Sequence, residues 1–126
     1  MSARVVVDVT SATPPFEQVR GQLAGHVAAG ALRPGDRLPT VRALAADLGL
    51  AVGTVARAYR ELEAQGVVVS RRRTGTVVAQ PAPGATQLPD RGLGEAVATL
   101  VARARSAGLD DQRVVDLVRA ALATRR

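Results

Sequence analysis

Apolar positions recur at helical spacing in the middle of the chain, between Leu50 and Gly66. One face of the predicted helix carries Val52, Val55, Ala56, Tyr59 and Leu62, and the other carries Arg57, Arg60, Glu61 and Gln65. This pattern predicts an amphipathic helix from about Val52 to Gln65. Its apolar face needs only a core, so the question is whether its polar face meets water or a second partner.

Two more helices are predicted upstream. The first runs from about Pro15 to Ala29, where prolines suit a helix start and Gly30 suits a left-handed end. The second runs over residues 41–48, with Thr40 as N-cap and Gly49 as stop. Their apolar stripes are Phe16, Val19, Leu23 and Val27 in the first, and Val41, Leu44, Ala45 and Leu48 in the second.

Short runs of β-branched residues predict strands. Residues 4–9, "RVVVDV", read as a short N-terminal strand, and Arg37-Leu38 is long enough only for a stub of strand after the Pro34-Gly35 turn. Downstream, "VVVS" and "TVVA" flank "RRRTG", which predicts two strands joined by a hairpin turn.

The last third of the chain opens with "QPAPGATQLPDRG", a composition typical of a linker. Two helices follow, the last capped by Asp110 or Asp111; their inward positions include Leu93, Val97, Leu100, Val101, Val114, Leu117, Val118 and Leu122. We therefore expect a domain at 1–80, a linker at 81–92 and a helical segment at 93–126. Two such helices bury too little surface alone, so they must pack on the first domain or on a second copy.

Composition narrows the function classes. All 17 basic residues are arginine, and the formal net charge is +6. Arginine suits phosphate and guanine edges, but its abundance is also typical of a GC-rich genome. Without cysteine or lysine, and with His26 as the single histidine, thiolate or histidine metal sites, Schiff bases and a P-loop are excluded. We expect no enzyme, no cofactor and no metal. Finding neither a secretory signal nor a membrane span, we expect a cytoplasmic protein without a membrane partner.

The order of the elements predicts a mainly helical fold with a small β-hairpin, a winged helix-turn-helix followed by a two-helix segment. In that geometry the helix from Val52 enters the major groove, and Arg71, Arg72 and Arg73 bring charge to phosphate. Two alternatives remain open. The three arginines could be a solvated run at a hairpin edge, and Arg57 and Arg60 could pair with Glu61, Glu63 or other acids along the helix. Tyr59 is assigned to the core, and Arg37 is either structural or a phosphate contact.

The string "LRPGDRLPTVRALAADLGLAVGTVARAYRELEAQGVV", followed by "RRTGTVV", resembles the DNA-binding domain of GntR-family bacterial transcription regulators over residues 14–79. The short helical tail resembles the YtrA-like branch, where it is associated with dimerisation. The resemblance implies DNA contacts by Arg42, Thr54 and Gly75. Many members carry a Ser/Asn-Arg pair where this chain has Ala51-Val52. Either Gly53 and Thr54 allow a close backbone approach, or specificity shifts toward Arg57, the wing and DNA shape.

The expected function is a sequence-specific, homodimeric repressor that binds a palindromic operator, with neighbouring transporter genes as targets in this branch. The alternative is a sequence-tolerant, nucleoid-associated DNA-binding protein. The predicted DNA contacts are Arg42, Gly53, Thr54, Arg57, Arg71, Arg72, Arg73, Thr74 and Gly75. The predicted dimerisation residues are Leu93, Val97, Leu100, Val101, Val114, Leu117, Val118 and Leu122. A small-molecule effector is left open, and its pocket would have to lie between subunits or between the tail and the winged domain.

Overall fold

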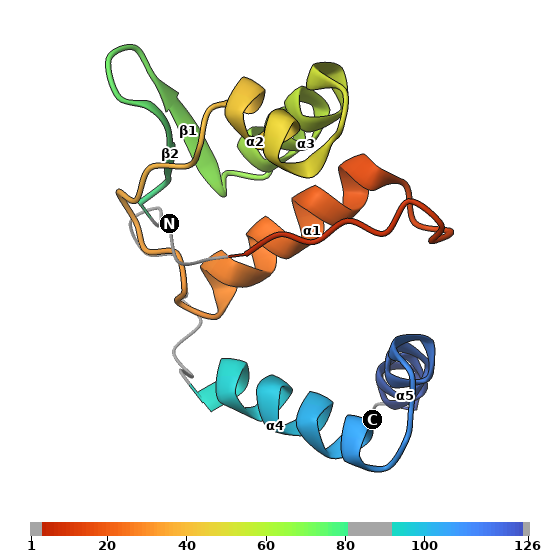
Figure 1. Ribbon diagram of the computed structural model, residues 1–126. Coiled ribbons are helices and arrows are strands. Elements are labelled where there is room, and N and C mark those ends of the chain that lie inside the picture. The colour runs from red at the N-terminus through yellow and green to blue at the C-terminus, as the bar shows by residue number, and fades with distance from the viewer. Residues whose placement is uncertain (1–3, 81–91, 125–126) are drawn as a thin grey trace. The chain divides into compact units, whose positions relative to one another are not determined.

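The computed structural model describes residues 4–80 and 92–124, which belong to two compact units, 1–89 and 90–126 (Figure 1). The elements of the first unit are α1 (Pro15–Ala28), α2 (Val41–Leu48), α3 (Val52–Ala64), β1 (Val68–Arg71) and β2 (Gly75–Val78). The second unit contains α4 (Gly92–Ser106) and α5 (Asp111–Ala123). The predicted linker lies outside the described residues apart from Gly92, which is the first residue of α4.

The ends of α1 and α2 follow the predicted sequence signals. Pro15 occupies the first turn of α1, and Gly30 follows its end with φ +84°. At the start of α2, the Thr40 hydroxyl oxygen accepts a hydrogen bond of 3.0 Å from the Ala43 N–H. Gly49 ends α2 in the left-handed region, with φ +68°. These signals fix the short turn between α2 and α3.

Helix α3 packs on the core by a face slightly different from the predicted one. Its buried residues are Val55, Ala58, Tyr59 and Leu62. The prediction placed Val52 on this face, but Val52, the first residue of α3, is 46 % exposed. The N-cap, Ala51, offers no side-chain hydrogen bond, as its sequence implies.

The hairpin has an antiparallel register that pairs Val68 with Val78 and Arg71 with Gly75. Three residues form its turn, and Gly75 follows them with φ +87°, a conformation that disfavours any side chain. The predicted stub at Arg37-Leu38 forms a single bridge to β2, between Arg37 and Val77. The loop before α2 is thereby attached to the outer edge of the hairpin.

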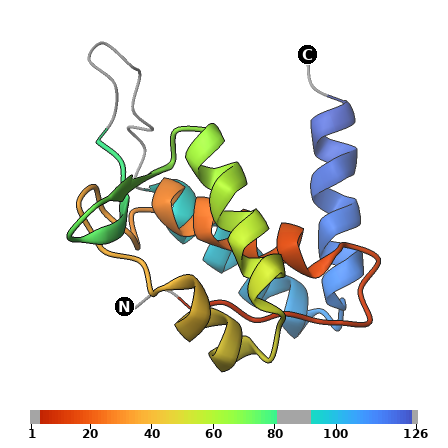
Figure 2. The same ribbon diagram turned by 90° about the horizontal axis from the view of Figure 1, so that it is seen from above.

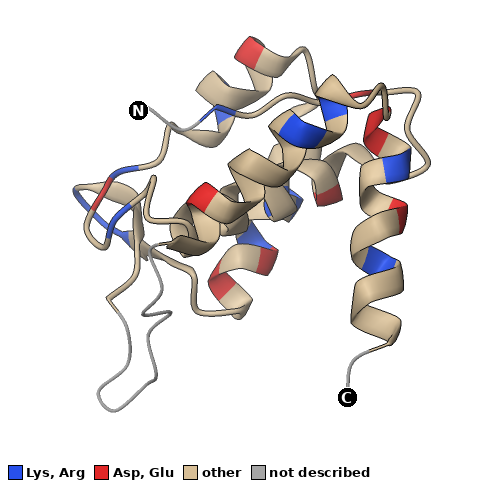
Figure 3. Cartoon of the chain, turned by 90° about the horizontal axis from the view of Figure 1, so that it is seen from below, with Lys and Arg blue, Asp and Glu red and all other residues tan. Residues whose placement is uncertain are grey.

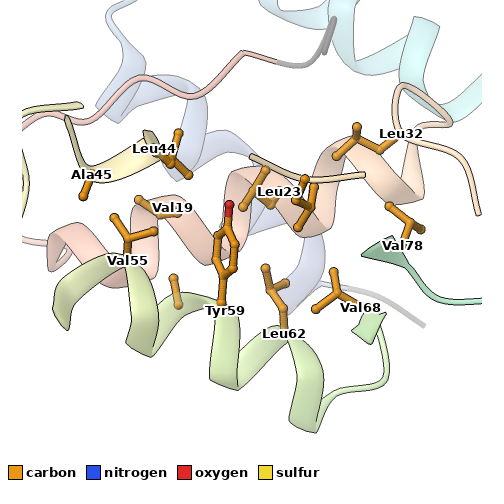
Figure 4. Close-up of a cluster of buried hydrophobic side chains, with 12 residues drawn as sticks. Val19, Leu23, Leu32, Leu44, Ala45, Val55, Tyr59, Leu62, Val68 and Val78 are labelled. Carbon is orange, nitrogen blue, oxygen red and sulfur yellow. The ribbon is translucent and has the colours of Figure 1, made fainter. Parts of the chain in front are cut away.

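The core lies between α1, α2, α3 and the hairpin (Figure 4). Its most buried large side chains are Leu23, Leu62, Val19, Val55 and Val78. Tyr59, 6 % exposed, lies among them, and its hydroxyl donates a hydrogen bond of 2.7 Å to the Pro39 carbonyl oxygen. Burial raises the pKa of Tyr59 to about 12. The assignment of Tyr59 to the core is confirmed.

The predicted strand at residues 4–9 is wrong, because no strand within residues 4–80 and 92–124 pairs with it. The segment is extended, but the side-chain amides of α1 replace a neighbouring strand. The Gln22 amide contacts the Val6 N–H and carbonyl oxygen at 2.9 and 2.6 Å. The Gln18 amide contacts the same two groups of Asp8 at 2.8 and 2.9 Å. In Figures 1 and 2 the segment runs alongside α1.

The second unit leaves most of its apolar side chains exposed. Helix α5 begins at the predicted cap, where the Asp110 carboxylate accepts a hydrogen bond of 2.9 Å from the Arg113 N–H. Among the apolar residues of α4 and α5, Ala104 is buried, whereas Leu117 is 51 % and Leu122 is 64 % exposed. None of the described helices combines the length and the apolar character that crossing a membrane requires.

Candidate nucleic-acid interface

The outer face of α3 is the first part of the candidate interface. Burial of Val55, Ala58, Tyr59 and Leu62 turns the residues between them away from the core. Gly53, in the first turn, is exposed, and a methyl group added at its Cα would meet no atom within 4 Å. Thr54 beside it is half-buried. The start of α3 therefore offers a smooth backbone surface, not a row of long side chains.

Arg57 lies on α3 but is engaged within the chain. Its Nε lies 3.5 Å from a carboxylate oxygen of Glu61, one helical turn away, and its guanidinium stacks 3.7 Å from the centre of the Phe16 ring. Both contacts are partly exposed and each is individually weak. The alternative pairing that the sequence left open is thus present. Phe16, predicted on the apolar stripe of α1, serves here as the platform for this arginine.

Arg42 stands in the first turn of α2, directly after the Thr40 cap. Its side chain is exposed, and no described acidic residue forms an ion pair with it. The cap fixes the direction in which this first turn starts. Arg42 is therefore an exposed cation on a rigid element, which suits a contact with phosphate or a base edge.

The hairpin turn carries the densest positive charge of the first unit. Arg71, Arg72 and Arg73 are all exposed, and none has an acidic partner among the described residues. In Figure 3 blue segments gather at this end of the domain, where the turn meets the loop before α2. Arg37 links the two, since its Nε donates a hydrogen bond of 2.6 Å to the Thr74 carbonyl oxygen. This contact shows a structural role for Arg37 and fixes the turn that presents Thr74 and Gly75.

A shallow groove of about 200 Å³ lies between α3 and the hairpin. It is lined by Val41, Ala56, Tyr59, Arg60, Glu63, Val68, Ser70 and Thr76. Arg60, exposed and without an ion pair among the described residues, stands at this groove between helix and wing. The predicted site did not include Arg60. Acid spacing in the sequence could not have separated Arg60 from Arg57, because Glu63 lies three residues after Arg60 just as Glu61 lies four residues after Arg57.

The geometry suits recognition of a polyanion, not catalysis. Exposed arginines on three elements surround a helix whose first turn is bare, and the groove is shallow. Within the described part of the chain, no group of three or more His, Asp or Glu side chains could hold a metal ion. Arginines of this kind position a nucleic-acid backbone through charge and through planar hydrogen bonding.

Comparison with known proteins identifies what the chain resembles. The model of the family described as bacterial regulatory proteins, gntR family, matches residues 15–78. The HTH-type transcriptional regulator Rv1152 of Mycobacterium tuberculosis is 48 % identical over 82 % of this chain and 81 % of its own length. The HTH-type transcriptional repressor YtrA of Bacillus subtilis is 37 % identical over 62 % of this chain and 60 % of its own length.

A solved structure extends the likeness to a DNA-bound state. The DNA-binding domain of AraR in complex with operator ORE1 is similar with a TM-score of 0.51 and 25 % identity. The match covers 60 % of this chain and 93 % of that domain. The predicted winged helix-turn-helix fold and the resemblance to gntR-family regulators are confirmed.

Proposed function

The chain belongs to the gntR family of bacterial regulatory proteins and is a DNA-binding transcription regulator, and we propose that it works as a homodimeric repressor of a palindromic operator. Repression is supported by the likeness to the repressor YtrA. The observation that carries the proposal is the set of exposed arginines, without ion pairs among the described residues, on α2, α3 and the hairpin turn. When such arginines neutralise DNA phosphates, counterions are released from the DNA, and this release raises the affinity of the protein for DNA.

In the proposed complex, α3 enters the major groove by its first turn. Gly53 and Thr54 bring the helix backbone close to the bases, while Arg42 contacts the backbone or a base edge beside it. Because Ala51 and Val52 lack hydrogen-bonding side chains, base readout by this turn is sparse. Shape readout and the wing therefore carry a larger share of specificity. Arg71, Arg72, Arg73 and the turn residues Thr74 and Gly75 follow the adjacent strand.

Arg57 and Arg60, on the rest of α3, differ in how readily they can contact DNA. Arg60 is without an ion pair among the described residues and lines the groove between helix and hairpin, so it is added to the predicted contacts. Arg57 must give up part of its contact with Glu61 or Phe16 before it binds phosphate. We therefore assign Arg60 the stronger contribution to affinity.

Homodimerisation is proposed to use α4 and α5. Their exposed apolar residues coincide largely with the predicted set: Leu93, Val97, Leu100, Leu117, Val118 and Leu122 are exposed, whereas Val101 and Val114 are half-buried. Such a stripe favours burial against the same stripe of a second copy. The resulting two-fold axis would present two winged domains to two half-sites of an operator.

The test is binding to the DNA upstream of the chain's own gene and of neighbouring transporter genes. A gel-shift titration at fixed salt should show a specific affinity at least about 10³ times the affinity for unrelated DNA of equal length. Footprinting should then reveal two protected half-sites with inverted symmetry. A ratio near one would support a sequence-tolerant, nucleoid-associated protein instead, and activation in a reporter assay would exclude repression.

A further inference from the structure

The extended segment at residues 4–8 has a structural feature that DNA binding does not use. Its two long edges differ. One edge is held by the side chains of α1: Gln18 and Gln22 bind Asp8 and Val6 as described above, and the His26 Nε2 lies 2.7 Å from the Arg4 carbonyl oxygen. The three α1 residues are spaced by four and their three partners by two. Four helical residues, which rise about 6 Å, thus match two extended residues, which rise about 6.6 Å.

The opposite edge is left open. In an extended chain the N–H and carbonyl groups of successive residues point to opposite edges. The α1 side chains bind the backbone of residues 4, 6 and 8, so the backbone groups of Val5 and Val7 face the other way. Within residues 4–80 and 92–124, nothing forms a hydrogen bond with the backbone N–H or carbonyl oxygen of either valine. Such an edge is a template for pairing with another strand.

The side chains of the segment divide in the same regular way. Val5 and Val7 are half-buried and pack against the core of the first unit. Arg4, Val6 and Asp8 point outward, and Val6 is 62 % exposed. The segment therefore has the two faces of a strand, one apolar and packed, the other exposed with a cation and an anion at its ends.

The order of these residues is self-complementary. When "RVVVD" is laid antiparallel to itself with Val6 on the two-fold axis, Val5 of one copy stands opposite Val7 of the other. Their open backbone groups then form four hydrogen bonds across the pair. Arg4 of each copy stands opposite Asp8 of the other, so both ends carry opposite charges, and such cross-strand pairs stabilise a sheet. The Asp8 carboxylate is available as an anion because hydrogen bonds from Thr10 lower its pKa.

We infer that residues 4–8 form a second self-association surface, which pairs antiparallel with residues 4–8 of another copy of this chain. This surface is separate from the proposed dimer contact of α4 and α5 and does not rest on it. A chain with two isologous contacts joins dimers into tetramers or longer arrays. On DNA, such pairing would connect dimers bound at different operators.

Disulfide trapping tests the pairing directly, because the chain has no cysteine of its own. In the proposed register the two Val6 residues form a non-hydrogen-bonded pair, with Cα atoms about 4.5 Å apart, which suits a disulfide. The full-length V6C variant is incubated with oxidised glutathione in the absence of DNA, and covalent dimer is followed on a denaturing gel. The matched control is V9C: Val9 is even more exposed, at 75 %, but lies about 20 Å from its own copy in this register.

V6C should form covalent dimer at least about tenfold faster than V9C. Equal rates, or no covalent dimer from V6C, would overturn the inference.

Charge reversal checks the register in the V6C background. R4E and D8R should each slow trapping about tenfold, because like charges then face each other at both ends. An equimolar mixture of R4E/V6C and D8R/V6C restores both opposite pairs and should regain the fast rate. If R4E leaves the V6C rate unchanged, the proposed register is wrong.

Discussion

The two exposed arginines of α3 show how neighbouring residues of the same type acquire different roles. Arg57 is spaced four residues before Glu61 and lies over Phe16, whereas Arg60 has no ion pair among the described residues and stands at the hairpin groove. Breaking a weak ion pair of an arginine costs little free energy, but this cost reduces the net affinity for DNA that the arginine provides. At the scale of one residue, the existing contacts decide which cations are ready to bind DNA.

Arg42 provides the sharpest residue-scale test of DNA binding. Arg42→Ala should weaken binding to the operator by about 1–3 kcal/mol, roughly 5- to 150-fold, because an exposed and rigidly placed cation is lost. Fluorescence anisotropy with labelled DNA measures this loss, and the slope of log affinity against log salt should fall by about one. Arg113→Ala, an exposed arginine of α5, is the control with equal charge. Equal affinities of the two variants would contradict a DNA contact by Arg42.

Tyr59 is the sole tyrosine and reports on the core at high pH. Its pKa is about 12 in the fold and about 10 in an unfolded chain. The unfolded state therefore ionises first, and the stabilisation from burying neutral Tyr59, fully present below pH 10, is lost as pH rises toward 12. Denaturant unfolding at several pH values should show this decline. Tyr59→Phe should lack this part of the decline and cost about 1 kcal/mol at neutral pH through loss of the bond to Pro39.

At the scale of the element, α3 combines a well-packed face with a weak first turn. Ala51 gives no cap, and Gly53 lowers helix stability. A helix start of this kind is a cost to folding. The cost is understandable if the bare turn has to approach DNA closely.

Gly53→Ala tests separately how Gly53 affects the stability of the fold and the affinity for DNA. The substitution should stabilise the fold by about 0.5–1 kcal/mol, because Gly53 has an ordinary helical conformation and an added methyl meets nothing within 4 Å. It should weaken DNA binding by roughly 1 kcal/mol, because the methyl holds the turn away from the bases. Thermal unfolding and anisotropy measure the two effects. The control is Gly21→Ala in α1, where an added methyl also meets open space; it should stabilise the fold without changing the affinity for DNA. An unchanged DNA affinity of Gly53→Ala would exclude a close approach of the first turn of α3 to DNA.

At the scale of the whole molecule, the two units differ in how they reach stability. The first unit has a core of buried residues from every one of its elements. The second leaves Leu93, Leu117 and Leu122 at least 48 % exposed. Isolated pairs of short helices are marginal, so we expect the second unit to depend on association.

Leu117→Asp should break that association. A carboxylate placed in the apolar stripe of α5 cannot be buried without a large cost, so the mass by sedimentation should halve and operator affinity should fall with it. Val9→Asp, which changes an exposed apolar residue outside the stripe, should keep the mass of the parent chain. An unchanged mass for Leu117→Asp would place the dimer contact elsewhere.

The sequence by itself determined the helices, the hairpin and their order, but not the state of residues 4–9. The ends of α2 at Thr40 and Gly49 and the hairpin turn before Gly75 depend on a local cap and on positive φ, and apolar periodicity identifies the core faces, so these features are encoded within a few neighbouring residues. The arginines at 71–73 followed from the same order, whereas Arg42 was assigned from the resemblance to GntR-family regulators. Their roles in DNA binding stay predictions.

Only the tertiary structure decided the pairings between distant residues. The sequence did not indicate that Gln18 and Gln22 would replace a strand beside residues 4–8, that Phe16 would support Arg57, or that Arg37 would hold the hairpin turn. Each of these contacts joins side chains or backbone groups far apart in the chain or on separate elements. Periodicity states which face of an element is buried, but the fold alone states what lies opposite it.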